Sequence, residues 1–169
     1  MILVKVEALK GSGDVTLEGY SDGNWFFANS FSFGVEREMK ESGEKGGTED
    51  INIGVGELQE CTISKSMDRT SPKLAQFAIN GNSLGGAELH FVALSGEDKP
   101  RPYLLYKLDR CFVKSWSTSG DADDRPTEEV AFYYNRIAFV VAGESAAFNW
   151  DRTTNRTWNH GLTPPPSPS

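Results

Sequence analysis

Apolar and polar residues alternate along much of this sequence, as they do in β-strands that bury one face. Branched and aromatic residues, which strands favour, are concentrated in the same segments. The pattern predicts strands at residues 2–9, 27–35, 58–65, 87–94, 103–116 and 130–141. A chain of 169 residues with this many strands favours one mainly β domain, a sandwich or barrel of two packed antiparallel sheets.

The segment at residues 27–35 divides sharply between its two faces. Strict alternation places large residues on one face (Phe27, Phe31, Phe33 and Val35) and small residues on the other (Ala28, Ser30, Ser32 and Gly34). We expect the large face to enter the core and the small face to point outward.

A single helix is expected among the strands. Ser71 can cap its start, Pro72 suits its first turn, and Gly81 can end it. Residues 35–57 carry charges and glycines with little periodicity, and a connection of that length is usually functional or disordered. Proline-rich residues 158–169 predict a disordered tail after a domain at residues 1–157.

Charge and hydropathy exclude several classes of protein. The net charge of −7 and the pI near 4.9 argue against a nucleic-acid binder, which needs clustered Lys and Arg for phosphates. No apolar run reaches the length of a membrane span, and the basic start and apolar run of a cleaved secretory signal are missing. We therefore expect a cytoplasmic protein, or one exported without a cleaved leader.

Five acidic side chains crowd residues 121–129 and could attract a hard cation such as Ca²⁺. The segment lacks the glycine and flanking helices of an EF-hand, and Pro126 favours a tight bend. We interpret the cluster as a solvent-facing turn between two strands.

Other candidate reaction centres are also weak. The "GNSLG" segment has the letters of a nucleophile elbow, but a helix precedes Ser83 and a strand follows it, which reverses the required geometry. His90 is expected within a strand and His160 near the chain end, so neither is a convincing base. Two cysteines in apolar runs and two distant histidines do not make a zinc site. The sequence predicts no enzyme, cofactor or metal.

Five separate blocks of sequence point to a family. They are "VKVEALKG" at 4–11, "SFSFGV" at 30–35, "KSMDRTSPKL" at 65–74, "DDRPTEEV" at 123–130 and "FNWDRTTN" at 148–155. In this order they resemble the haemolysin-coregulated protein (Hcp) family, whose members are tube subunits of type VI secretion systems. The resemblance covers the chain from its start to about residue 155.

The resemblance implies an Hcp-like β-barrel with one flanking helix. It also implies six copies in a ring, rings that stack into a hollow tube, and cargo carried inside. The expected partners are further copies of the chain, a spike protein, a contractile sheath and effector proteins, with no nucleic acid and no membrane insertion. Secretion would follow synthesis in the cytoplasm, without a cleaved signal peptide.

Three groups of residues gain roles from this resemblance. Ser30 and Ser32 would line the lumen of the tube, or would only face solvent or a neighbouring subunit. The bend formed by Asp123, Asp124, Arg125 and Pro126 would set the fold. The charged segment containing Glu38, Met39, Lys40, Glu41, Glu44 and Lys45 would contact the next ring, or would be a loop with no binding role.

A second hypothesis from another class stays open. The chain could be a monomeric β-sandwich module that binds carbohydrate or protein. Exposed aromatic residues among the four tryptophans would support this reading, namely Trp25, Trp116, Trp150 and Trp158.

Overall fold

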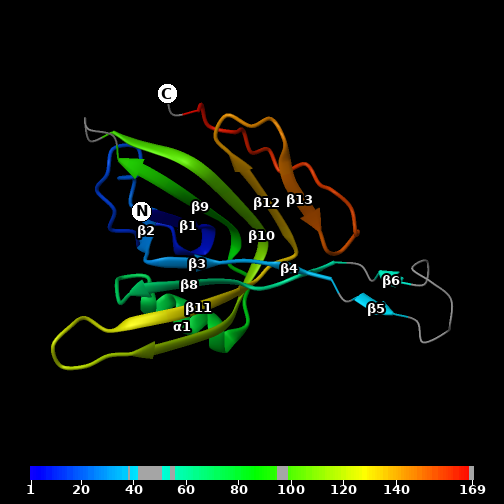
Figure 1. Ribbon diagram of the computed structural model, residues 1–169. Coiled ribbons are helices and arrows are strands. Elements are labelled where there is room, and N and C mark those ends of the chain that lie inside the picture. Colours follow the sequence, from blue (N-terminus) through cyan, green and yellow to red (C-terminus); the bar gives the residue numbers. More distant parts are fainter. Residues whose placement is uncertain (38, 42–50, 54–55, 95–98, 168–169) are drawn as a thin grey trace.

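The computed structural model describes residues 1–37, 39–41, 51–53, 56–94 and 99–167 (Figure 1). These residues form β1 (Ile2–Val6), the 3-10 turn η1 (Glu7–Leu9), β2 (Trp25–Ala28), β3 (Ser30–Ser32), β4 (Val35–Glu36), β5 (Met39–Glu41), β6 (Ile51–Ile53), β7 (Glu57–Leu58), β8 (Cys61–Ser66), α1 (Ser71–Asn80), β9 (Gly85–Leu94), β10 (Pro100–Ser119), β11 (Thr127–Tyr133), β12 (Arg136–Val141) and β13 (Ala147–Asp151). The expected mainly β class, with antiparallel sheets and one helix, is confirmed.

The longest strand, β10, belongs to two sheets. Residues 100–111 of β10 pair with β9, residues 104–109 pair with β12, and residues 112–119 pair with β11. The first sheet therefore has the order β2-β1-β9-β10-β12-β13, and the second has the order β10-β11-β8-β3. Every pairing is antiparallel.

The chain passes between the sheets a second time at Asn29. β2 pairs with β1 in the first sheet, β3 pairs with β8 in the second, and the Asn29 N–H donates to the Ser64 carbonyl at 2.7 Å. The ladder of strand pairs thus has β2 and β3 at its ends and stays open. The molecule is a sandwich joined at two corners by the chain, instead of a closed barrel.

This crossing changes the phase of the side-chain alternation. Ala28 and Phe31 both pack against the core, although they are three residues apart. Phe27, expected on the same face as Phe31, is instead 41% exposed on the outer face of the first sheet. Val35 is exposed as well, because β4 pairs with β7 beyond the edge of the core.

Helix α1 packs against β10 with Leu74 fully buried, as its apolar spacing predicted. Pro72 lies in its first turn, and Gly81, with φ of 70°, ends it. The N-cap residue is Thr70 instead of Ser71, whose hydroxyl accepts a hydrogen bond from the Asp68 N–H at 2.9 Å. Among the described residues no helix is long and apolar enough to cross a bilayer.

The C-terminal residues 158–167 lie on the outer face of the first sheet. Trp158 Nε1 donates to the Ile137 carbonyl at 2.9 Å, and its backbone N–H donates to Asn149 Oδ1 at 2.7 Å. Further along, the Gly143 N–H donates to the Pro165 carbonyl at 3.0 Å. Trp158 and Pro165 thus connect the proline-rich segment to the first sheet.

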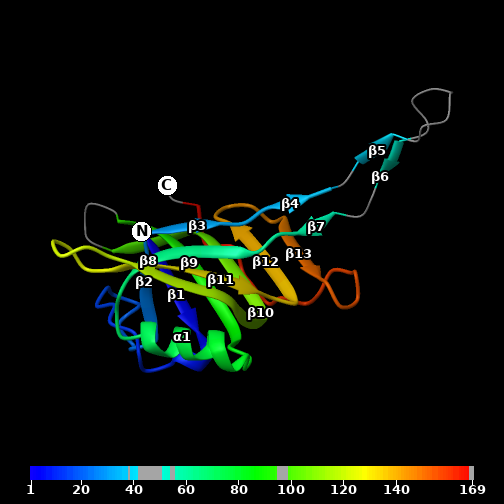
Figure 2. The ribbon, with the colours of Figure 1, turned by 90° about the horizontal axis from the view of Figure 1, so that it is seen from below.

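Two short ladders extend from the body, where the sequence showed little periodicity. β4 pairs with β7, and β5 pairs with β6 further out. Figure 2 shows these pairs projecting from the side of the molecule next to β3, well away from α1.

Candidate functional site

The outward side of the second sheet, which we call the hydroxyl face, carries mostly small polar side chains. Cross-strand register brings Ser30, Ser64, Glu129 and Ser117 into one row, and Ser32, Thr62, Ala131 and Ser115 into the next. Ser30 and Ser32 are exposed, so their predicted outward direction is confirmed. Glu129 is the carboxylate within these two rows.

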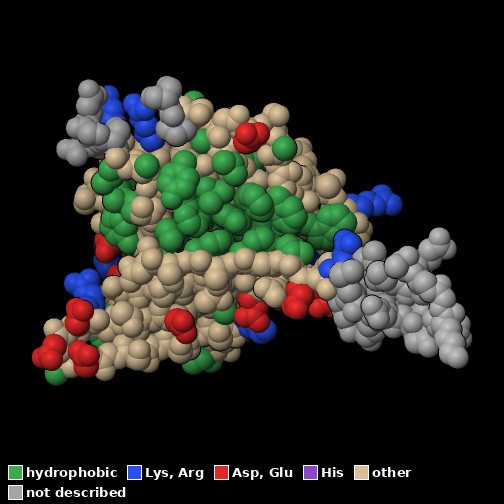
Figure 3. All heavy atoms as spheres, in the orientation of Figure 1, with side chains coloured by type: hydrophobic (Ala, Val, Ile, Leu, Met, Phe, Trp, Pro, Cys, Tyr) green, Lys and Arg blue, Asp and Glu red, His purple; other side chains and the backbone are tan. Residues whose placement is uncertain are grey.

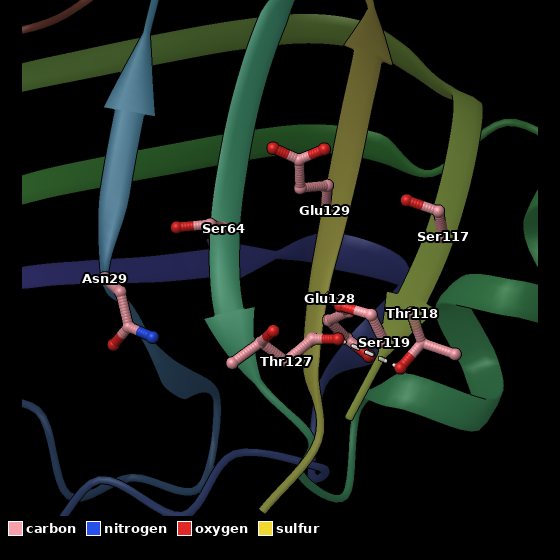
Figure 4. A pocket seen from close by; sticks show the side chains of 8 residues that line it. All are labelled: Asn29, Ser64, Ser117, Thr118, Ser119, Thr127, Glu128 and Glu129. Carbon is pink, nitrogen blue, oxygen red and sulfur yellow. Dashed lines mark hydrogen bonds between the residues drawn. The ribbon is translucent and has the colours of Figure 1, made fainter. Parts of the chain in front are cut away.

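A hollow of about 340 Å³ lies on this sheet (Figure 4). Its lining comes from neighbouring strands and consists of Asn29, Ser64, Ser117, Thr118, Ser119, Thr127, Glu128 and Glu129. Ser30 Oγ lies 2.5 Å from Ser64 Oγ, and the Thr118 hydroxyl donates to the Thr127 carbonyl at 2.9 Å. The hydroxyls therefore bind one another and the backbone, and the surface they form is smooth and hydrophilic.

Beneath this face lies a buried ion pair that sequence reasoning missed. The side chains of Lys65 and Glu128 are both 0% exposed, and Lys65 Nζ lies 2.5 Å from Glu128 Oε1. Lys65 Nζ also contacts Asp68 Oδ1 at 2.9 Å and Ser71 Oγ at 3.2 Å. The alternation of the sequence could have indicated that Lys65 is buried, because it lies two residues after Ile63 and four after Cys61, on the same face of β8.

These contacts join two of the sequence blocks that carry the family resemblance. Lys65, Asp68 and Ser71 lie in the "KSMDRTSPKL" block, and Glu128 lies in the "DDRPTEEV" block. The pair links β8, β11 and the start of α1, so both blocks hold the fold together.

The predicted acidic bend lies between β10 and β11 and is exposed along Asp123, Asp124, Arg125 and Pro126. Its carboxylates bind the local backbone: the Arg125 N–H donates to Asp124 Oδ1 at 2.7 Å. The Pro126 carbonyl accepts from the Met67 N–H at 2.9 Å, which connects the bend to the end of β8. In the described part of the chain, no cluster of His, Cys, Asp or Glu is arranged to hold a metal ion.

The side chains weighed as reaction centres take part in structural contacts. His90 Nδ1 lies 3.0 Å from the Tyr20 hydroxyl, and its Nε2 lies 3.5 Å from Glu88, whose pKa it lowers. The Ser83 hydroxyl donates to the Cys111 carbonyl and accepts from the Gly85 N–H. Both cysteines are buried and free, and burial raises the pKa of the Cys61 thiol to about 12.

A second surface, which we call the aromatic groove, lies on the first sheet beside the edge of β3. Its side chains point to the same side as the core but extend beyond the cover of the second sheet. They are half-buried or exposed: Ile2, Phe31, Phe33, Phe91, Tyr106, Phe139, Val141 and Phe148. Figure 3 shows the resulting continuous hydrophobic band.

The rings of the groove contact one another in a chain across the strands. Phe31 packs on Tyr106 at a centroid distance of 4.8 Å, Tyr106 on Phe139 at 5.0 Å, and Phe139 on Phe148 at 5.1 Å. Phe91 meets the edge of Phe31 at 5.5 Å. The groove is thus a packed and preformed surface.

The predicted stacking segment coincides with the projecting ladders only in part. Met39, Lys40 and Glu41 form β5, in register with residues 51–53 of β6. Glu38, Glu44 and Lys45 lie outside the described residues.

The premise of the monomeric binding hypothesis is wrong, because none of the four tryptophans is exposed. Trp25 is buried beneath residues 10–24, and Trp116, Trp150 and Trp158 are half-buried. The indoles are therefore at least partly packed within this subunit, and none of them is one of the exposed aromatic residues that the hypothesis requires.

Comparison with known proteins gives the family. Residues 4–140 match the family described as "Type VI secretion system effector, Hcp". The chain belongs to the Hcp family. Hcp proteins are type VI secretion system tube and effector proteins, and the expected family is therefore confirmed.

Solved structures share the Hcp fold. "Structure of a type six secretion system protein" aligns with a TM-score of 0.76 at 24% identity, over 93% of this chain and 98% of that one. Hcp1 from Salmonella typhimurium aligns with a TM-score of 0.69 at 19% identity, over 93% and 97%. A type VI secretion system effector from Yersinia pestis aligns with a TM-score of 0.67 at 14% identity, over 89% and 99%. Comparison with curated protein sequences gives no significant match.

Proposed function

We propose that this Hcp protein is a structural tube subunit, whose copies close into hexameric rings through the two free edges of the second sheet. Among the described residues, β3 pairs only with β8, and residues 112–119 of β10 pair only with β11. Exposed edges of this kind are normally covered or paired, because their backbone groups are unsatisfied. This pair of free edges is the observation that carries the proposal.

The number of strands in the second sheet suits closure. Four antiparallel strands run from β10 to β3, so the two outer strands point in opposite directions. When copies are related by rotation about an axis roughly parallel to the strands, each strand points in the same direction in every copy. β3 of one copy would then meet β10 of the next in an antiparallel pair, and a heterologous contact of this kind closes into a ring.

The difference between the two sides of the second sheet supports a choice of the side that faces the ring axis. The first sheet and α1 cover one side, and the hydroxyl face is the other. A ring closed through the sheet edges would place Ser30, Ser32 and Glu129 around a hollow centre. Small hydrophilic side chains there would leave room for cargo and keep the surface hydrated, which supports a role for Ser30 and Ser32 in the lumen.

The projecting ladders supply a contact along the tube. β5 and β6 extend beyond the body. We assign contact with the ring above or below to the charged residues from Glu38 to Lys45, of which residues 39–41 form β5. Spike protein, contractile sheath and effector cargo are the corresponding partners within the secretion system. The exposed bend at Asp123–Pro126 would serve the fold of the subunit and take no part in catalysis.

Native mass spectrometry and negative-stain imaging of the purified full chain test the ring. We expect particles of about six copies with a central opening, because a heterologous interface with fixed rotation closes at a defined number of copies. A strict monomer at high protein concentration would contradict the proposal and favour a monomeric binding module.

A further inference from the structure

The aromatic groove is a large apolar surface that the described residues of the subunit leave partly uncovered. Val141 on its open side is 43% exposed, and exposed apolar patches of this kind mark interaction sites. We propose that the groove of one copy receives helix α1 of the neighbouring copy, with Ile79 as the side chain that enters it. The inference rests on the proposed ring, and it adds a contact between α1 and the groove beside the proposed pairing of β3 with β10.

Cross-strand register arranges the groove residues of the first sheet, which form the floor of the groove, in two rows. Ile2, Phe91 and Val141 lie in the outer row, which Leu104 connects. Tyr106, Phe139 and Phe148 lie in the next row, which the buried core residues Leu89 and Val4 continue. β3, with its unpaired edge, borders this floor. If a strand of a neighbouring copy paired with β3, the element packed on the core side of that strand would therefore lie over the groove.

The border of the second sheet opposite β3 is formed by residues 112–119 of β10, and α1 packs against β10. Figure 2 shows α1 on the side of the molecule away from β3, β8 and β11, which is the side that would face outward from a ring. A neighbour that pairs its β10 with β3 consequently carries its α1 to the groove side of the junction.

The outward surface of α1 carries an exposed isoleucine. Ile79 is 85% exposed, more than any other large hydrophobic residue in the described chain. Helical spacing places it one turn from Gln76 on the outward side, away from buried Leu74. Most of the Ile79 side chain is therefore left uncovered by the described residues of its own subunit.

Charge is consistent with this pairing. The helix carries one ionisable side chain, Lys73, whose Nζ donates to Ser12 Oγ at 2.6 Å within the same subunit. The groove is lined by aliphatic and aromatic groups. Charged residues are depleted at the centre of protein interfaces, so a nearly neutral helix suits an aromatic floor.

Rotation between copies leaves space for the helix. If the hydroxyl faces turn toward a common axis, the layers behind them splay apart from one copy to the next. A wedge then opens between the second sheet of one copy and the first sheet of its neighbour. Helix diameter with side chains is about 10 Å, comparable with the spacing of packed layers, so α1 would fill the wedge.

Directed cross-linking tests the inference. Ile79→Cys and Val141→Cys are prepared as two separate full-length variants, mixed, dissociated and reassembled, and then treated with a short bismaleimide. We expect cross-linked dimers in the mixture and none with either variant alone, because the contact joins two different surfaces. The native cysteines are buried and do not compete. Phe27→Cys, exposed on the opposite face of the first sheet, replaces Val141→Cys in the control mixture.

The outcomes separate the two proposals. Rings by native mass spectrometry, with no more cross-linking in the Val141 mixture than in the Phe27 mixture, overturn the helix contact and leave the ring intact. Absence of rings for the unmodified protein overturns both. As a second measurement, Ile79→Asp should raise the concentration for half-assembly about tenfold or more, whereas Ile79→Leu should leave it nearly unchanged. Equal assembly by both variants also overturns the inference.

Discussion

The hydroxyl face and the aromatic groove are both sheet surfaces outside the core, and they differ in what they require. On the hydroxyl face, Ser30 and Ser64 bind each other and Glu129 is solvated, so the surface is stable in water as it is. In the groove, Phe91, Tyr106 and Phe139 are packed together but only half covered. One fold thus presents a surface suited to water and another suited to a partner.

The largest effect is expected beneath the hydroxyl face. Glu128→Ala removes the nearer of two carboxylates around the buried Lys65 ammonium and leaves Asp68 at 2.9 Å. Leaving a buried charge with no partner costs about 3–5 kcal/mol, so we expect the free energy of unfolding to decrease by about 3 kcal/mol, the lower end of that range. Urea unfolding of the purified protein measures it. Glu129→Ala, one residue along and on the exposed side, is the matched control and should stay within about 0.5 kcal/mol. Equal effects of the two substitutions would contradict the assigned faces.

A smaller effect is expected in the groove. Val141→Asp places a charge on the apolar floor, and we expect assembly weakened about tenfold or more, because that charge would be desolvated in the contact. Phe27→Asp alters an equally exposed position on the opposite face and should assemble normally. Sedimentation velocity over a concentration series distinguishes them. Normal assembly by Val141→Asp would show that the groove needs no partner.

On the hydroxyl face, a larger side chain should reduce cargo retention more than the loss of a hydroxyl does. Ser32→Gln projects a large amide from the second row of the face, so rings should form but retain a co-expressed secretion effector several-fold less well. Ser32→Ala removes only the hydroxyl and serves as the control. Rings of Ser32→Gln that retain cargo normally would rule out a lumen position for Ser32.

The smallest effect concerns β13, which holds Phe148 at the far side of the groove. Hydrogen bonds from the Thr153 hydroxyl and N–H and from Arg136 lower the pKa of Asp151 from 3.8 to about 2. A depressed carboxyl pKa adds stability above pH 4, and this stability is lost as the pH falls from about 4 toward 2.

Thermal unfolding between pH 5 and pH 2 checks this pH dependence. The melting temperature of Asp151→Asn should start lower at pH 5 and decrease less than that of the parent protein. Parallel curves for the two proteins would show that Asp151 does not supply this part of the acid sensitivity.

Local patterns predicted most of the elements. Period-two alternation located β1, β8, β9 and β10, and Pro72 with Gly81 correctly bracketed α1. The expected strand at 130–141 divides into β11 and β12, because the chain turns at Tyr134 and Asn135 while both halves stay apolar. Alternation reports a buried face and does not report where a strand changes partners.

The sites were less accessible to such reasoning. The outward direction of Ser30 and Ser32 followed from alternation because both lie on one side of Asn29. Phe27 lies before that crossing and was misplaced. The partner of Lys65 was invisible in the sequence, since 63 residues separate it from Glu128.

The sequence alone determined the mainly β class, the single helix and, through its spaced blocks, the Hcp family. Only the tertiary structure decided that the sandwich stays open along β3, that its two outward surfaces differ in chemistry, and that residues 158–167 pack on the first sheet. The physical reason is range. Side-chain periodicity is set within a few residues by backbone geometry, whereas an uncovered groove depends on which distant strands come to lie side by side.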